Sequence, residues 1–408
     1  MNFEINLPRN VSYIIDELND NGYPTYVVGG CVRDSIIGIT PNDWDICTAA
    51  KPEDVMRVFS SRKIILTGLR HGTVTVVVDD EQFEVTTFRI DGKYSDNRRP
   101  EEVYFTKNII DDLSRRDFTI NAMAYNTKSG LIDPFGGQHD IEKKIVRCVG
   151  NADDRFNEDA LRILRCIRFS IKYKYSIDGY TATSIMKNLS LLNHISKERI
   201  ISELVKTLPY GCSYMLARAI QEIVPELNSE RFAQCTVVEA FNTKTSLTAK
   251  LAFFFDFDES ILINVFERLK SSNKARRAIC ATRRAAEGAM RLLNSKTQIE
   301  IVAKYILSVA EPYAEDVVMF IKLKAIEDDD KDLRKLILAV QYCLRKHDNK
   351  PYKIAHLEVN GNDIQAIGYK GEQIGYMLNQ LLEMVIHKQI ENRRSDLMEY
   401  LMDRVNKH

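Results

Sequence analysis

The sequence predicts an α+β protein, with an α/β head at the N-terminus followed by an all-helical remainder. Before residue 150, short runs rich in β-branched residues alternate with turns, and Asp79-Asp80 separates two of these runs at hairpin spacing. After residue 150, apolar residues recur with a period of about 3.6, which is typical of amphipathic helices. We expect strands over 25–30, 64–68, 73–78 and 83–89, and helices over 9–19 and 52–60, the second starting at Pro52.

Length and composition limit the class of protein. The chain has 408 residues, of which 45% are hydrophobic and 28% charged, and its 57 Lys and Arg are balanced by 57 Asp and Glu. This globular composition excludes a wholly disordered or collagenous chain and is consistent with two to four domains. A neutral chain can still bind nucleic acid through a local basic patch.

Cysteine usage and hydropathy indicate the compartment. None of the eight cysteines forms a Cys-x-x-Cys pair, no apolar run approaches the roughly 20 residues of a membrane span, and the N-terminus has no signal pattern. We therefore expect a cytoplasmic protein with reduced, buried thiols, no membrane contact and no obvious protein partner.

The segment 27–48, VVGGCVRDSIIGITPNDWDICT, places a glycine pair near a carboxylate pair. Gly29 and Gly30 follow a strand and precede a helix-like stretch, where backbone N–H groups can approach a phosphate. Asp43 and Asp45 occupy alternate positions in a strand-like context, so both can reach one site. Two carboxylates with substrate phosphates suit Mg²⁺, which would activate a hydroxyl and stabilise a departing pyrophosphate. The alternative is a solvated turn, which explains the whole string less well.

A polar loop and an Arg-Arg-Asp motif follow. Residues 87–105 contain glycine, proline and adjacent arginines, which predict an exposed loop between two strands. In the segment 114–126, SRRDFTINAMAYN, Asp117 and Asn121 have i, i+4 spacing, so one helix face can offer a carboxylate and an amide to ribose hydroxyls. The alternative is a surface helix with local ion pairs.

The segment 157–169, NEDALRILRCIRF, places acidic and basic residues on one predicted helix. Glu158, Arg162 and Arg165 share a face, and Asp159 lies three residues before Arg162. An Asp acceptor beside an Arg donor can pair with the edge of C or A, whereas G and U present the reverse pattern of donors and acceptors. The alternative is an ordinary helix-stabilising Glu–Arg pair.

These segments together resemble the class II nucleotidyltransferases of the DNA polymerase β superfamily, which comprise bacterial-type tRNA CCA-adding enzymes and related poly(A) polymerases. The segments GGCVRDSIIGITPNDWDICTAAKPEDV, RRDFTINAM and EDALR carry the resemblance, and residues 360–397 extend it to the C-terminal part. It implies a nucleotidyltransferase head with a mixed sheet, then a helical neck, body and tail. The expected boundaries are 1–148 for the head, 149–210 for the neck, 211–345 for the body and 346–408 for the tail.

The resemblance also implies roles for individual residues. Asp43 and Asp45 are expected to be catalytic and to bind Mg²⁺, and Glu84 is the candidate third carboxylate, with a solvent-facing strand residue as its alternative. The expected nucleotide contacts are Gly29, Gly30 and Arg33 for the triphosphate, Arg116, Asp117 and Asn121 for the ribose, and Glu158, Asp159 and Arg162 for the base, with Arg165 and Arg168 on phosphate.

The implied activity is addition of C, C and A to the tRNA 3′ end from CTP and ATP, with release of pyrophosphate and no nucleic-acid template. The loop at 87–105 resembles the loop that final A addition needs. Alternatives are a poly(A) polymerase, against which the lack of a long basic tail argues, an enzyme adding only CC or only A, and a catalytically silent RNA-binding protein.

A basic segment in the helical half is a candidate tRNA contact. Residues 268–296 contain nine Lys and Arg and one acidic residue, Glu287. Such a one-sided run more often meets phosphate than forms a solvated helix face. The expected contacts with the tRNA backbone are two pairs seven residues apart, Arg276, Arg277, Arg283 and Arg284.

Overall fold

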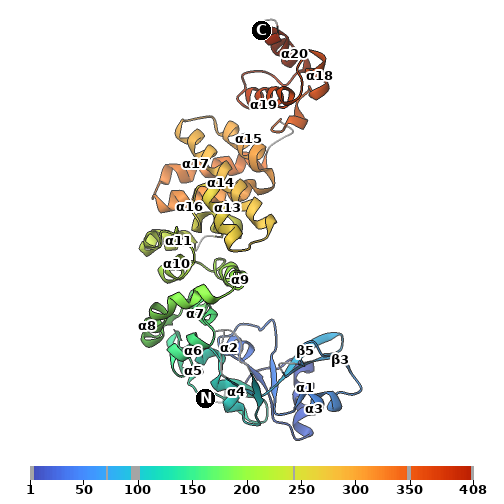
Figure 1. Cartoon of the computed structure of the whole chain (residues 1–408), viewed down its shortest axis with the longest axis vertical. Coiled ribbons are helices and arrows are strands. Elements are labelled where there is room, and N and C mark those ends of the chain that lie inside the picture. The colour runs from blue at the N-terminus through green and yellow to red at the C-terminus, as the bar shows by residue number, and fades with distance from the viewer. Residues whose placement is uncertain (1–3, 70–71, 93–101, 242–243, 347–350, 406–408) are drawn as a thin grey trace. The chain divides into compact units, whose positions relative to one another are not determined.

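The structure is a computed structural model (Figure 1), and it describes residues 4–69, 72–92, 102–241, 244–346 and 351–405. The central part of the loop predicted over 87–105 lies outside the described residues. The chain divides into two compact units, each described separately. The first comprises Met1–Thr207 with Met215–Pro225, and the second comprises Leu208–Tyr214 with Glu226–His408.

A mixed sheet forms the core of the head, as predicted. Its strands are β1 (Thr25–Val28), β2 (Ile46–Thr48), β3 (Lys63–Ile65), β4 (Thr73–Val78), β5 (Glu81–Thr87), β8 (Ala124–Asn126) and β9 (Gly130–Ile132). In the described part of the chain they pair in the order β3-β4-β5-β2-β1-β8-β9, with β2 and β5 parallel and the other neighbours antiparallel. Both residues of the β4–β5 turn, Asp79 and Asp80, have positive φ, which suits the twist of a two-residue hairpin.

Short helices and strand pairs complete the first unit. Its helices are α1 (Arg9–Asp20), α2 (Gly30–Ile36), α3 (Pro52–Val58), α4 (Ile109–Ser114), η2 (Thr119–Asn121), α5 (Gly137–Lys143), α6 (Ala152–Glu158), α7 (Leu161–Tyr173), α8 (Gly179–Asn188), η3 (Leu189–His194), α9 (Lys197–Thr207) and α10 (Tyr214–Gln221), whose first residue falls in the second unit. The additional strand pairs are β6 (Arg89–Asp91) with β7 (Val103–Phe105) and β10 (Ile145–Val146) with β11 (Ser176–Ile177).

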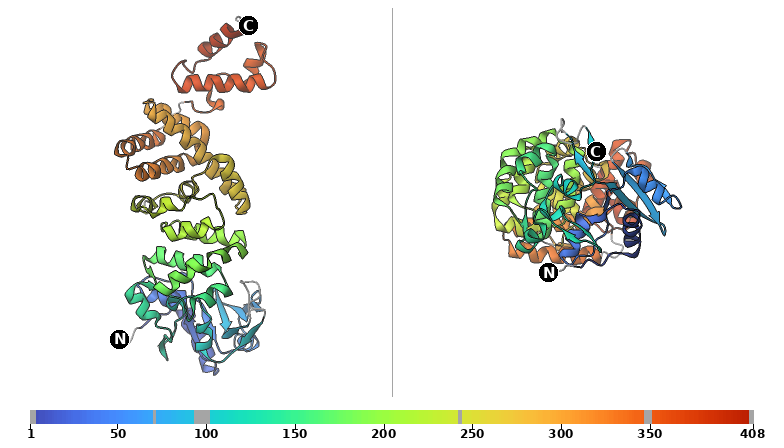
Figure 2. Two further views of the ribbon diagram at one scale, coloured as in Figure 1. Left: turned by 60° about the vertical axis from the view of Figure 1, so that its left-hand side comes forward. Right: turned by 90° about the horizontal axis from the view of Figure 1, so that it is seen from below.

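The two faces of the head sheet have different neighbours. Helices α1 and α3 pack on the strands, as Figures 1 and 2 show for the blue part of the chain. A separate cluster joins Tyr26, Val28 and Cys47 of β1 and β2 to Leu113 of α4. Alternate residues of a strand point to the same face, so Asp45, two residues before Cys47, lies on the face that packs against α4. The segment that follows α4 therefore lies on the same face as Asp45.

The second unit is helical in its described residues. Its elements are η4 (Glu230–Ala233), α11 (Cys235–Phe241), α12 (Leu247–Phe254), α13 (Glu259–Arg268), α14 (Asn273–Asn294), α15 (Ile299–Ala310), η5 (Glu311–Tyr313), α16 (Ala314–Glu327), α17 (Lys331–Arg345), η6 (Ile354–His356), α18 (Gly361–Ala366), α19 (Glu372–Ile386) and α20 (Arg394–Val405). Helices α14 to α17 pack side by side. Buried rings such as Phe253, Phe254 and Phe320 fill the bundle, and α18 to α20 enclose a second apolar cluster.

The prediction of a sheet-containing head and a helical remainder is confirmed, and β11 is a two-residue exception after residue 150. Among the described residues, no helix is both long enough and apolar enough to cross a bilayer. The thiols whose side chains are described are unpaired, and all except Cys343 are buried.

A close backbone approach joins α5 to η2. A Cβ atom on Gly137, the first residue of α5, would lie 2.3 Å from the carbonyl oxygen of Thr119. The backbone N–H of Gly137 also donates to the Asp133 carboxylate at 2.7 Å, which fixes the start of the helix.

We expect Gly137→Ala to lower the free energy of unfolding by about 1–3 kcal/mol, because the backbone at Thr119 must move. The matched control is Gly179→Ala at the first residue of α8, where an added Cβ meets nothing within 4 Å. That control should be neutral or stabilise by about 0.4–1 kcal/mol. Urea denaturation measures both, and equal stability of the two variants would contradict the predicted steric conflict.

Candidate active site

Asp43 and Asp45 lie directly before β2, which begins at Ile46, and not within the strand as predicted. The strand pairing nevertheless extends to Asp45, because Val28 N–H donates to its carbonyl oxygen at 3.0 Å. Ile46 pairs with Val85 in the parallel β2–β5 ladder. The preceding residues, Asp45 and Glu84, therefore lie side by side on one face of the sheet.

The three predicted carboxylates, Asp43, Asp45 and Glu84, line one open cavity of about 800 Å³. Asp45 is exposed toward this cavity yet flanked closely by protein. Burial raises its pKa, Arg116 lowers it, and the nearby charge of Asp43 raises it further. Among the described residues no group of three His, Cys, Asp or Glu side chains is arranged to hold a metal. Two mutually repelling carboxylates that supply only oxygen ligands nevertheless fit a hard divalent cation.

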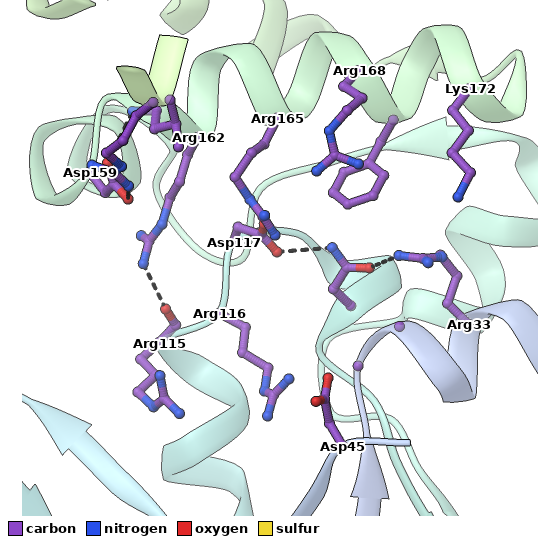
Figure 3. A pocket seen from close by; sticks show the side chains of 16 residues that line it. Arg33, Asp45, Arg115, Arg116, Asp117, Asp159, Arg162, Arg165, Arg168 and Lys172 are labelled. Carbon is purple, nitrogen blue, oxygen red and sulfur yellow. Dashed lines mark hydrogen bonds and ion pairs between the residues drawn. The ribbon is translucent and has the colours of Figure 1, made fainter. Parts of the chain in front are cut away.

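A second cavity, of about 550 Å³, adjoins the first at Asp45 and is strongly basic (Figure 3). Its acidic lining residues are Asp45, Asp117 and Asp159. Its basic lining residues are Arg33, Arg115, Arg116, Arg162, Arg165, Arg168, Lys172 and Arg199. Such an excess of positive charge in a concave site attracts a polyanion such as a triphosphate.

Gly29 and Gly30 form the turn from β1 into α2 at the wall of this cavity. Gly29 has a φ of +74°, and a Cβ atom there would lie 2.7 Å from Nη1 of Arg116. A side chain at this position would therefore be strained and would displace the arginine. The glycine lets Arg116 lie directly against the backbone of the turn.

Asp112 holds the arginine pair and was not found from the sequence. Its side chain is fully buried, and it accepts from Nη2 of Arg115 at 2.6 Å and from Nη2 of Arg116 at 3.1 Å. Burial alone raises the pKa of Asp112, but Arg116 and Arg115 outweigh it and lower the pKa below its usual value. The sequence signal that could have found it is its position three and four residues before the two arginines.

The predicted ribose pair is assembled without a common helix. Helix α4 ends at Ser114, and Asn121 belongs to the separate turn η2. The Asn121 side chain still donates to Oδ1 of Asp117 at 3.0 Å. Arg165 of α7 donates to Oδ2 of Asp117 at 2.8 and 2.6 Å, and Arg33 donates to Oδ1 of Asn121. Both side chains are buried at the cavity wall.

The predicted single helix over 157–169 is wrong. Helix α6 ends at Glu158 and α7 begins at Leu161, and Asp159 between them has extended dihedral angles. The break lets the Asp159 carboxylate accept from the backbone N–H of Leu161, two residues later, at 3.1 Å, as in an Asx turn. The separation of Asp159 from Arg162 is therefore set by a turn and not by helix spacing.

Each member of the predicted base-reading couple has its own partner. Arg162 donates to Glu158 at 2.5 Å and to the backbone carbonyl of Arg115 at 3.1 Å, the latter drawn in Figure 3. Asp159 accepts from Nη2 of Arg199 at 2.8 Å. Both members line the same cavity. Arg199, on α9, was missed because no local pattern connects it with the EDALR segment.

The two further arginines of α7 are anchored as well. Arg165 pairs with Asp117, and Arg168 donates to the buried Glu203 at 2.6 Å. The guanidinium of Arg168 also lies 4.4 Å from the ring centroid of Phe169. Both line the cavity, so their predicted role on phosphate stays a prediction that the geometry permits.

The four predicted tRNA-binding arginines lie on α14 in the second unit and differ in exposure. Arg276, Arg277 and Arg284 line a surface groove of about 380 Å³. Arg283 is buried, pairs with Asp256 at 2.7 Å and packs over the ring of Phe320 at 5.0 Å. Arg283 therefore lies on the apolar side of α14 and packs in the core of the second unit.

The Asp117–Arg165 pair predicts a pH dependence of stability. Burial raises the pKa of Asp117, but Arg165 and Asn121 outweigh it and lower the pKa from 3.8 to about 2. A depressed pKa in the folded state contributes stability above the unfolded pKa that is lost as pH falls through the folded one. The contribution at neutral pH is about 2 kcal/mol.

We therefore expect the stability difference between wild type and Asp117→Asn to be constant from pH 5 to 8 and to shrink by about 1 kcal/mol at pH 3. Urea denaturation across this range measures it. The control is Asp20→Asn, which removes the exposed pair with Lys128 and should change stability little at any pH in this range. If the stability difference between wild type and Asp117→Asn stays constant down to pH 3, the lowered pKa of Asp117 is contradicted.

Comparison with known proteins places this geometry in a family. Residues 25–147 match the Poly A polymerase head domain. A CCA-adding enzyme of Ligilactobacillus salivarius is 32% identical over 402 residues, covering 95% of this chain and 94% of that protein. The enzyme of Oceanobacillus iheyensis is 33% identical over 96% of each chain. With the Geobacillus kaustophilus enzyme, identity rises to 49% over 195 residues, and this match spans about half the length of each protein.

Solved structures agree over almost the whole chain. The Bacillus stearothermophilus CCA-adding enzyme in complex with CTP is 28% identical, covers 97% of each chain and superposes with a TM-score of 0.73. The Thermotoga maritima CCA-adding enzyme complexed with tRNA shares the fold, with a TM-score of 0.68 at 21% identity. The sequence relatives from Ligilactobacillus salivarius and Oceanobacillus iheyensis match almost the whole chain at over 30% identity, and this shows that the chain belongs to the family of CCA-adding enzymes.

Proposed function

We propose that this protein adds C, C and A to the 3′ end of tRNA, using CTP and ATP and releasing pyrophosphate without a nucleic-acid template. The observation that carries the proposal is one cavity whose wall includes Asp45, the Asp117–Asn121 pair and the residues Asp159 and Arg162. A nucleoside triphosphate can thus be read at its phosphates, ribose and base in one site. Membership of the CCA-adding family supports the choice of substrate.

Base selection is assigned to Asp159 and Arg162. The carboxylate accepts from the exocyclic amine of C or A, and the guanidinium donates to a ring nitrogen of either base. G and U present the opposite groups, so they leave a buried donor or acceptor unpaired, which is costly. A protein couple of this kind takes the place of a template base.

Ribose selection is assigned to Asp117 and Asn121, together with Arg116, which lines the same cavity. The Asn121 amide has a second N–H beyond the one given to Asp117, and this group can donate to a ribose hydroxyl. Because both side chains are held by neighbouring arginines, they need little reorganisation when the nucleotide binds.

The reaction is a displacement at the α-phosphate. The tRNA 3′-oxygen forms a bond to the α-phosphorus and loses its proton, while the bond to the bridging oxygen breaks and pyrophosphate leaves. We propose that Asp43 and Asp45 hold Mg²⁺, with Glu84 as the third carboxylate. The bound ions would activate the hydroxyl and stabilise the negative charge of the leaving group. Arg116 and the other cavity arginines hold the triphosphate by charge-assisted hydrogen bonds.

The helical unit is proposed to hold the tRNA backbone through Arg276, Arg277 and Arg284. These groove-lining cations would contact phosphate without reading sequence, so binding should weaken as salt rises. Arg283 is left out because its side chain is buried against the core, whereas Arg276 and Arg284 line the groove even though they pair with Glu267 and Glu259. The described thiols are unpaired and all but Cys343 are buried, which is consistent with a reducing compartment, and we propose the cytoplasm as the site of action.

Three tRNA transcripts test the activity directly. They end before CCA, after C and after CC, and each is incubated with each nucleotide and resolved on a sequencing gel. We expect CTP with ATP to complete CCA and the product then to stop growing. A stop after CC would mean a CC-adding enzyme, and an A ladder without C would mean a poly(A) polymerase. Either result would overturn the proposal.

The base-reading assignment predicts that loss of base selectivity and loss of nucleotide transfer arise from different substitutions. Asp159→Ala should reduce the preference for C and A over G and U by roughly 10- to 100-fold, because one half of the recognition couple is gone. Asp43→Ala should abolish transfer of all four nucleotides. Single-turnover rates with each nucleotide measure both effects. An Asp159→Ala enzyme that is slower but equally selective would contradict the assignment.

A further inference from the structure

The guanidinium of Arg33 lies on an aromatic platform provided by α7. Its central carbon is 5.1 Å from the ring centroid of Phe169 and 4.9 Å from that of Tyr173. The two rings are nearly parallel, with an interplanar angle of 16°. Arg33 is only 5% exposed, and a cation–π contact is strongest where water is excluded. The head residue is thus fixed by rings from a helix more than 130 residues later in the chain.

The Tyr173 hydroxyl adds a second constraint. It donates to Oδ1 of Asp34 at 3.0 Å. The same oxygen accepts from Nε and Nη2 of Arg33 at 2.9 and 2.8 Å. Burial is the main factor that raises the pKa of Tyr173, so the hydroxyl stays protonated and remains a donor. Ring and hydroxyl together fix both the plane and the edge of the Arg33 guanidinium.

The remaining nitrogen of Arg33, Nη1, donates to Oδ1 of Asn121 (Figure 3). The Nδ2 of Asn121 donates to Asp117. Because Arg33 can only donate and the Asp117 carboxylate only accept, the two contacts agree on one orientation of the amide. A displaced Arg33 would free the amide to rotate and would remove its ligand-facing N–H.

We infer that Tyr173 is a positioning residue for ribose selection, acting through Arg33 on Asn121. The inference rests on the proposed function, in which Asn121 reads the ribose. Among the described residues, Phe169 and Lys172 line the nucleotide cavity while Tyr173 does not, so Tyr173 acts without touching the nucleotide. Its contribution should appear with ribonucleotides and be missing with deoxyribonucleotides, which lack the 2′-hydroxyl.

The test compares CTP with dCTP on a full-length tRNA transcript that ends before CCA. For Tyr173→Leu we expect the ratio of kcat/KM with CTP to kcat/KM with dCTP to fall about tenfold. Any loss of triphosphate affinity through Arg33 affects both nucleotides equally and cancels in this ratio. Tyr173→Phe keeps the ring and loses the hydroxyl, and its ratio should fall about threefold. The matched control is Tyr175→Phe, which removes a tyrosine hydroxyl two residues away. The side-chain hydrogen bonds to Asp34 described here come from Tyr173 and Arg33, so this variant leaves them in place.

Two outcomes separate this inference from the proposed function. If CTP and dCTP lose kcat/KM equally, or if neither Tyr173 variant changes their ratio, the inference is overturned, because lost folding or triphosphate affinity affects both nucleotides. If the wild-type enzyme itself does not distinguish CTP from dCTP, the ribose role proposed for Asn121 fails instead. Thermal unfolding establishes that each variant is folded, and Tyr173→Phe keeps the test decisive should Tyr173→Leu not fold.

Discussion

Carboxylates behind the cavity wall make the basic site possible. Eight cationic side chains lie around one cavity, and without compensation their mutual repulsion in a partly desolvated space would oppose folding. Asp112 holds Arg115 and Arg116 from the buried side, and Asp117 holds Arg165. Each acid also fixes the direction of its arginine, so the charges that attract a triphosphate are placed before it arrives.

The carboxylate partners hold each arginine in place and still leave some of its N–H groups available to a ligand. An arginine with one edge bound to a protein carboxylate keeps further N–H groups for a ligand, because the guanidinium has five donors. Arg162 illustrates the point, since it contacts both Glu158 and a backbone carbonyl while lining the cavity. A lysine in its place would offer a point charge without this division of edges. The carboxylate partners therefore reduce the repulsion between the arginines and leave N–H donors that can bind a ligand.

The sequence predicted the elements that depend on local patterns. The glycine turn and the switch from strands to helices follow from neighbouring residues and lie where they were expected, whereas the Asp-x-Asp pair lies just before its strand and not within it. What could not be predicted depends on partners distant in sequence. Arg199 reaches Asp159 across 40 residues, and Tyr173 reaches Asp34 across 139. The burial of Arg283 was missed for the same reason, since spacing along α14 does not reveal which side meets the core.

Helix α7 contacts the segments that carry the residues proposed to recognise the nucleotide. Arg162 contacts the backbone of Arg115, Arg165 holds Asp117, and Tyr173 holds Asp34. Successive turns of one rigid helix thus meet the arginine pair, the ribose pair and the glycine-turn helix. Since residues within one hydrogen-bonded network do not act independently, base choice and ribose choice should be energetically coupled. With the roles proposed above, a shift of α7 would disturb both at once, so the accuracy of nucleotide choice would depend on the register of this helix against the head.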